Sequence, residues 1–178
     1  SLVGKILSDL EAFKKDNPDG YLDFFRGFGR VLKEGLHSDY EHADKLKELV
    51  MFPSDKTEEG KLTTLRAYKD AMAEGQKEIY YLVAESVENA KNSPQLEAFR
   101  KRDIDVLFFA DPVDEWILDA MGEYDGTKLR AIDKGEIELG SDEEKAAEKK
   151  ELEDAGKEYK ALLDFIKDKL KDDIKDVR

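Results

Sequence analysis

The sequence predicts an α/β protein in three consecutive parts: a three-helix linker, a small α/β/α three-layer unit with a short parallel sheet, and a long charged amphipathic helix. Three observations support this prediction. Apolar residues recur three and four positions apart over residues 2–50, which is the period of amphipathic helices. Three β-prone apolar runs follow between residues 79 and 132, and charged side chains dominate from residue 141 onward.

The first two helices are predicted from their apolar faces. In the first helix the apolar positions form one wide stripe that we expect to face the core, made of Leu2, Ile6, Leu10 and Phe13 and flanked by Val3 and Leu7. The Asn-Pro-Asp-Gly turn at residues 17–20 ends this helix, because proline cannot continue it and glycine tolerates positive φ. The second helix, ending near Gly35, carries an aromatic face that we expect to pack on the first, made of Tyr21, Phe24, Phe25, Phe28 and Leu32.

A third helix is predicted between Asp39, which can cap its N-terminus, and Pro53. The polar residues 54–61 show no apolar period, so they predict a surface loop and a first domain boundary. A short helix over residues 62–72 follows, and Gly75 marks a turn.

The sheet is predicted from three runs, at residues 79–84, 104–110 and 128–132. Helical patterns separate the runs, and Ser93-Pro94 and Asp111-Pro112 each offer an N-cap followed by a first-turn proline. Continuous apolar strands need cover on both faces, and crossovers between parallel strands use helices. We therefore expect a small parallel sheet between two helical layers.

Three domains are predicted from these patterns: a helical linker at residues 1–54, the α/β/α unit at 55–133, and a further segment at 134–178. In the last segment, apolar residues from Leu152 to Leu170 form a stripe on an otherwise charged helix, which needs a partner surface. The sequence begins inside a helical pattern and stops after an apparent strand start, so we expect a piece of a longer protein.

The composition bears on partners and location. Forty-three acidic residues against thirty basic ones give a formal net charge of −13, which disfavours nucleic acid and anionic membranes as partners. The sequence contains no cysteine, signal peptide or apolar run of transmembrane length. A cytoplasmic location is the resulting expectation.

Candidate catalytic and metal-binding residues all have simpler explanations. His37 and His42 lie five positions apart, whereas metal pairs on a helix lie three or four apart, so we expect two separate surface histidines. Asp111, with Asp114 and Glu115 nearby, could hold Mg²⁺ or accept a phosphoryl group at the end of a parallel strand. The simpler interpretation of Asp111 is a helix N-cap before Pro112.

Two interpretations of Trp116, the single tryptophan, remain open. Its helical period with Val113 and Ile117 indicates a core residue that covers the sheet. Alternatively, an indole at the edge of that stripe beside the acidic Glu115 would form a contact site for partly unfolded proteins.

The order and spacing of several motifs resemble the heat-shock protein 90 chaperone family, nearest its bacterial HtpG branch. The resemblance covers nearly the whole chain and rests on Phe28-Gly29, residues 32–35 (LKEG), residues 74–81 (EGQKEIYY), Glu85-Ser86, residues 93–97 (SPQLE), residues 106–108 (VLF), residues 111–116 (DPVDEW) and residues 125–129 (DGTKL).

The resemblance implies a non-catalytic segment of an ATP-driven chaperone, spanning the end of the middle domain and the start of the C-terminal domain. It implies that the ATPase domain, with its ATP and Mg²⁺, and the helices that make the parent protein a homodimer lie outside this sequence, and that the segment itself holds no catalytic residue, metal or cofactor. It further implies a role in relaying conformational change and in contacting client proteins through Glu115, Trp116 and Asp119. A phosphoacceptor using Asp111 and a purely structural spacer stay as alternatives.

Overall fold

The computed structural model describes residues 1–135, 137, 139 and 150. The chain divides into two units, Ser1–Ile137 and Glu138–Arg178. The boundary predicted after residue 54 lies within the first unit, and the division of that unit into two domains stays a prediction. The long charged helix predicted within residues 134–178 lies almost entirely outside the described residues.

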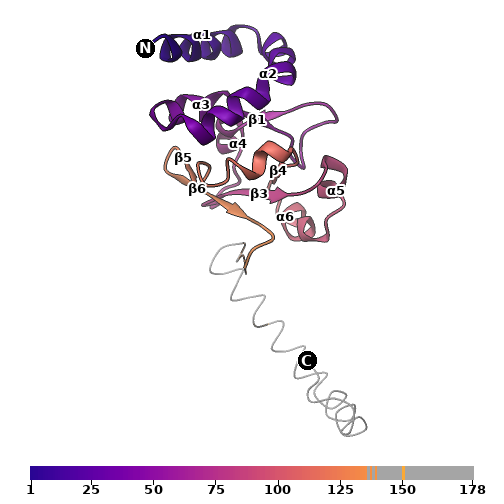
Figure 1. Ribbon diagram of the computed structural model, residues 1–178. Helices are drawn as coiled ribbons and strands as arrows, with labels where there is room; N and C mark the ends of the chain where they lie inside the picture. The colour runs from indigo at the N-terminus through magenta and orange to yellow at the C-terminus, as the bar shows by residue number, and fades with distance from the viewer. Residues whose placement is uncertain (136, 138, 140–149, 151–178) are drawn as a thin grey trace, which may run out of the picture. The chain divides into compact units, whose positions relative to one another are not determined.

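Three helices form the first part of the chain (Figure 1): α1 (Leu2–Asp16), α2 (Pro18–Ser38) and α3 (Ala43–Leu49). Asn17 ends α1 and caps α2 by accepting a hydrogen bond from the Gly20 amide. The fully buried Tyr21 ties α2 to α3, since its hydroxyl donates to the Leu49 carbonyl at 2.6 Å. Tyr21 also meets Phe13 of α1 edge to face, so the predicted aromatic contact between the first two helices is confirmed.

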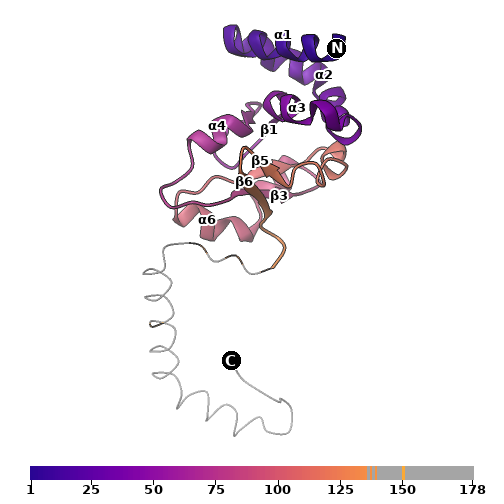
Figure 2. The same ribbon diagram turned by 90° about the vertical axis from the view of Figure 1, so that its left-hand side faces the viewer.

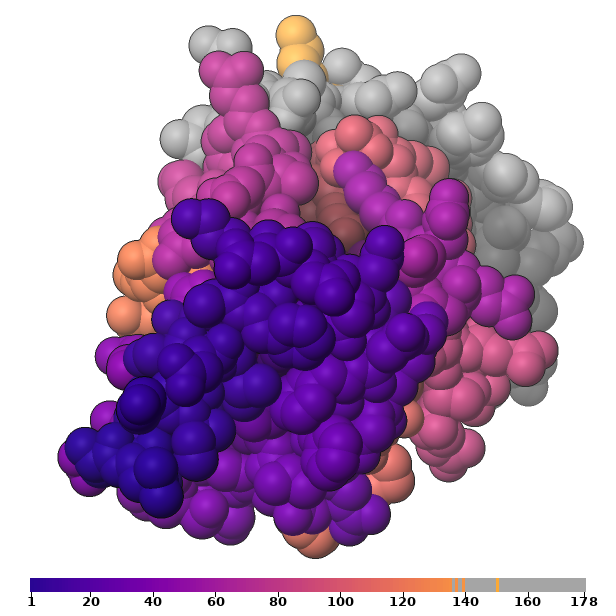
Figure 3. Space-filling view, turned by 90° about the horizontal axis from the view of Figure 1, so that it is seen from above, coloured from indigo at the N-terminus to yellow at the C-terminus, as the bar shows by residue number. Residues whose placement is uncertain are grey.

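The predicted core stripe of α1 is wrong at its N-terminal end, whereas Leu10 packs against the core as predicted. Leu2 and Ile6 are 75% and 49% exposed, and Leu7 on the neighbouring flank is the buried residue of this helix. The reason is that α3 approaches that other flank, where Lys45 Nζ donates to Ser8 Oγ at 2.8 Å. Figure 3 shows, in indigo, the N-terminal part of the chain from the side that faces the viewer.

Two further boundaries of the helical part differ from the prediction. The helix α2 continues past Gly35 to Ser38, because Gly35 is helical and its carbonyl accepts the Asp39 amide that closes the helix. Asp39 caps a short 3-10 helix, η1 (Tyr40–His42), before α3 begins.

Phe28, predicted on the packed face of α2, is 57% exposed because it lies at the edge of that face beyond Phe24.

A four-stranded sheet has the order β4-β3-β6-β5. The central β3 (Ile79–Val83) pairs in parallel with β4 (Leu107–Phe109) and with β6 (Thr127–Ala131), so the three predicted strands and their parallel pairing are confirmed. A short β5 (Glu123–Tyr124) adds antiparallel to β6 through a hairpin that the strand pattern alone does not predict. Asp125 and Gly126 form its turn with φ of 46° and 74°.

The sheet is covered on both faces, which confirms the three-layer α/β/α prediction. Alternate residues of β3 point to opposite faces: Tyr80 meets Phe99 of α6 at 5.0 Å between ring centroids, whereas Tyr81 stacks on Phe109. One layer contains α5 (Val87–Lys91), a 3-10 helix η2 (Pro94–Leu96) and α6 (Glu97–Lys101). Figures 1 and 2 show α6 on the side of the sheet opposite to α3 and to α4 (Leu65–Asp70), which is shorter than the predicted helix at 62–72.

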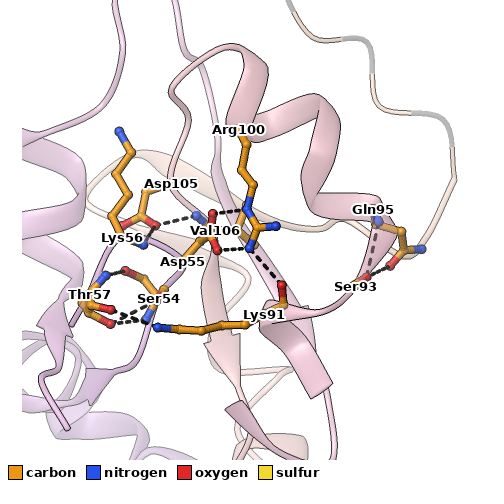
Figure 4. A network of polar contacts seen from close by, with 10 residues as sticks. All are labelled: Ser54, Asp55, Lys56, Thr57, Lys91, Ser93, Gln95, Arg100, Asp105 and Val106. Carbon is orange, nitrogen blue, oxygen red and sulfur yellow. Dashed lines mark hydrogen bonds and ion pairs between the residues drawn. The ribbon is translucent and has the colours of Figure 1, made fainter. Parts of the chain in front are cut away.

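The predicted loop at residues 54–61 lies between two short antiparallel strands, β1 (Met51–Phe52) and β2 (Thr63–Thr64). Its first residues run along the outer edge of β4: the Phe108 amide donates to the Pro53 carbonyl at 2.8 Å, and the Asp55 amide donates to the Val106 carbonyl at 2.9 Å. Ser54 is therefore fully buried, contrary to the surface position expected for it. Figure 4 shows Asp55 also accepting two hydrogen bonds from Arg100 of α6, at 2.6 and 2.8 Å.

Candidate functional site

The segment after β4 carries the predicted site residues. Asp111 caps the 3-10 helix η3 (Pro112–Glu115) by accepting from the Val113 amide at 3.1 Å. Asp114 closes a capping box by accepting from the Asp111 amide at 3.0 Å. The predicted cap role of Asp111 is thus confirmed, but the amphipathic α-helix expected to follow it is wrong, because only four residues are helical.

Asp114 fixes this turn to α2. Its side chain turns into the protein, where Oδ1 lies 2.6 Å from Nζ of Lys33 on α2, and the two residues are 1% and 5% exposed. The segment predicted as a continuous helix is thus a 3-10 turn that is held to α2 by a tertiary contact. Burial raises the pKa of the Asp114 carboxyl, while the neighbouring Lys33 ammonium opposes that shift.

The buried ion pair has few other partners. Lys33 Nζ lies 4.6 Å from the centroid of the Phe52 ring, a cation–π contact. Among the described residues, no donor with hydrogen-bond geometry reaches Asp114 Oδ1, so the carboxylate oxygen is balanced by the charge of Lys33 alone. Removal of the lysine would leave a buried charge uncompensated.

Trp116 projects from the same turn into solvent. Trp116 is 54% exposed, so the core interpretation of this residue is wrong. Its exposure agrees with the second interpretation, whereas contact with partly unfolded proteins stays a prediction. Its carbonyl oxygen accepts from Nδ1 of His37, on α2, at 3.0 Å. Ile117 and Met121 are buried beneath the turn. Glu115 and Asp119 are exposed, so the turn presents an indole between two acidic residues.

The acidic residues do not form a cation site. Asp111 is engaged as a cap and Asp114 is turned toward Lys33, so their carboxylates serve different contacts. Within the part of the chain that the structure describes, no three side chains of the metal-binding types gather. The arrangement therefore gives no support to a Mg²⁺ site or phosphoacceptor at Asp111.

The two histidines serve separate contacts, as their spacing predicts. His37 is exposed and bonds to the Trp116 carbonyl, whereas His42 bonds to Asp39, with 2.8 Å between Nδ1 and Oδ2. The expectation of a surface position is wrong for His42, whose side chain is 13% exposed, because Asp39 and Ser1 both contact it.

Sequence reasoning missed Lys33 and His37 as parts of this site. A signal was present: Lys33 follows Leu32 on the buried face of α2, and His37 lies four residues later on the same side. A lysine on the buried face of a helix indicates a buried partner, but the sequence does not show which acidic residue supplies it.

Comparison with known proteins decides the family. The family model described as "Hsp90 protein" matches residues 1–178, the whole chain. This chain belongs to the Hsp90 protein family. The resemblance inferred from the sequence motifs is confirmed.

Individual relatives agree with this assignment. The chain is 46% identical over 178 residues to "Chaperone protein HtpG" of Geobacter sulfurreducens, and 42% identical over 177 residues to the protein of the same name from Alkalilimnicola ehrlichii. It covers 27% of the length of each of these relatives. Among solved structures, the middle domain of a Plasmodium falciparum heat shock protein matches with a TM-score of 0.71 and 34% identity, over 75% of this chain and 56% of that one.

The chain is therefore a segment of an Hsp90-family protein, and its fold resembles that of the middle domain. In the described part of the chain, no helix has both the length and the apolar character needed to cross a bilayer.

Proposed function

We propose that this segment serves a chaperone of the Hsp90 family as a non-catalytic part that contacts partly unfolded client proteins through Trp116, Glu115 and Asp119. The proposal includes a parent protein that is a cytoplasmic homodimer, and in which ATP and Mg²⁺ act on a separate N-terminal domain. Family membership and the name of the relatives, "Chaperone protein HtpG", support the chaperone part of this proposal.

The observation that carries the proposal is the exposure of Trp116. Large aromatic side chains are usually buried, and this one is 54% exposed although the turn that bears it is fixed by a capping box and an ion pair. A rigid exposed indole offers apolar area to a client at little cost in conformational entropy. The carboxylates of Glu115 and Asp119 favour basic stretches of a client over acidic ones.

The test is binding of a partly unfolded protein to Trp116→Ala, measured by isothermal titration. We expect affinity to fall about tenfold, as for an interface aromatic, while the melting temperature stays within about 2 °C, because little buried area is lost. Tyr40→Ala is the matched control, since Tyr40 is an aromatic residue that is 80% exposed elsewhere. Equal binding by Trp116→Ala and the parent chain would refute the proposed contact.

A further inference from the structure

We infer that Lys33 and His37 of α2 are positioning residues that set how Trp116 is presented, so that the orientation of α2 controls the proposed client surface. This inference rests on the proposed function for its link to clients. Its structural half, the control of Trp116 by α2, is independent of any client. The contacts that support it join residues 81 and 79 positions apart: Lys33 Nζ lies 2.6 Å from Oδ1 of the η3 residue Asp114, and His37 Nδ1 lies 3.0 Å from the Trp116 carbonyl oxygen.

The first contact resists separation. The Lys33 and Asp114 side chains are almost completely buried, and the carboxylate has no alternative cation among the described residues near it. If α2 moved and η3 stayed in place, the Asp114 carboxylate, which is 1% exposed, would be left buried without its counter-charge. Movement of α2 is therefore expected to carry η3 with it.

The second contact fixes direction as well as distance. His37 lies one helical turn beyond Lys33 on the same side of α2, and its Nδ1 donates to the Trp116 carbonyl. Two attachments one turn apart restrain the rotation of η3 about either one. Because the second attachment is the backbone of Trp116 itself, the direction of the indole depends on it.

The helical end of this connection is also rigid. Tyr21 joins α2 to α3 by a buried hydrogen bond, and Phe13 of α1 packs on the Tyr21 ring. The sheet end is held by Phe52, which faces the Lys33 ammonium and stacks on Phe109 of β4 at 4.6 Å. A rearrangement of the three helices thus reaches Trp116 through a short series of packed side chains.

Trp116 supplies its own readout, because the sequence contains one tryptophan. We would measure acrylamide quenching and the emission maximum in four variants of the full chain: Lys33→Met/Asp114→Asn, His37→Ala, His37→Asn and Arg30→Met. The double variant removes both buried charges, and its asparagine can still accept from the Asp111 amide. Arg30→Met is the matched control, since it removes one positive charge and an exposed ion pair with Glu34 from the same helix.

For Lys33→Met/Asp114→Asn and His37→Ala, we expect the quenching constant to change about twofold while far-UV circular dichroism stays that of the folded chain. His37→Asn should restore the parent value, because its amide nitrogen can occupy the place of Nδ1. Arg30→Met should match the parent. Unchanged quenching in folded His37→Ala would overturn the inference, even if the double variant failed to fold.

Client binding tests whether these residues act through Trp116. His37→Ala should weaken binding about fivefold in the parent chain and have no effect in Trp116→Ala, because the residues then share one pathway. Equal weakening in both backgrounds would show an independent structural effect and refute positioning. If Trp116→Ala itself leaves client binding intact, the proposed function fails, whereas the quenching result still decides whether α2 positions the indole.

Discussion

Replacement of Lys33 by methionine tests how the buried ion pair contributes to stability. Methionine is close to lysine in length, so the principal change is the loss of the ammonium 2.6 Å from Asp114 Oδ1. Breaking a buried pair by removing one partner costs about 3–5 kcal/mol. Asp114 is 1% exposed and has no replacement donor at Oδ1 among the described residues, so we expect a value in that range near neutral pH.

The pH dependence of this loss distinguishes a charge effect from a packing effect. Burial already raises the Asp114 pKa above its ordinary value of 3.8, and removal of Lys33 takes away an opposing influence, so the pKa in the folded variant rises further. A carboxyl whose pKa is higher in the folded state takes up its proton there first. The loss in free energy of unfolding caused by Lys33→Met is therefore complete above the pKa of Asp114 in the folded variant. It declines as the pH falls through that pKa, by at most about 1.4 kcal/mol per pH unit.

Urea unfolding of the parent chain and of Lys33→Met, at about pH 7 and about pH 5, gives the two differences in free energy of unfolding. We expect the smaller difference at the lower pH. Comparison with the parent at each pH removes the titration of the other acidic residues. A difference that is equal at both pH values, or larger in acid, would refute the argument that an unpaired Asp114 carboxylate causes the loss.

Two other substitutions test the fold. Tyr21→Phe should lower the free energy of unfolding by about 1–3 kcal/mol, because the Leu49 carbonyl loses a buried donor. Thermal unfolding measures this loss, and an unchanged melting temperature would show that the hydrogen bond contributes nothing. Gly126→Ala should destabilise the β5–β6 hairpin by about 1 kcal/mol or more, because φ at this position is 74°. Amide hydrogen exchange in β6 should therefore be faster than in the parent chain, and an equal or slower rate would contradict this prediction.

The sheet was predictable because its signals are local. The runs that form β3, β4 and β6 are continuous and apolar. Ser93 and Asp111 are N-cap residues, and their side chains accept hydrogen bonds from backbone amides within the next three residues. The hairpin turn at Asp125-Gly126 had an equally local signal in its Asp-Gly pair. The Asp-Gly pair alone did not predict the hairpin, because the strand before it, β5, is only two residues long and has no strand pattern of its own.

The direction of exposed and buried faces was less predictable. Whether Leu2 or Leu7 of α1 is buried depends on where α3 lies, and apolar period alone does not fix this. Trp116 has the spacing of a core residue, yet Asp114, two residues earlier, takes the inward position because Lys33 is there to neutralise it. The candidate residues on η3 could be named from the sequence, but the partners on α2 could not, since the contact spans residues far apart in the chain.

The path of residues 53–55 along β4 has a consequence for the proposed contact with client proteins. An uncovered strand presents free amide and carbonyl groups on which another chain can add as a new strand. Here the Phe108 amide and the Val106 carbonyl at that margin already bond to the chain's own Pro53 and Asp55. An extended polypeptide therefore finds no free backbone groups for strand pairing at this edge of β4. Under the proposed function, a client would be held here by reversible side-chain contacts from which it can be released.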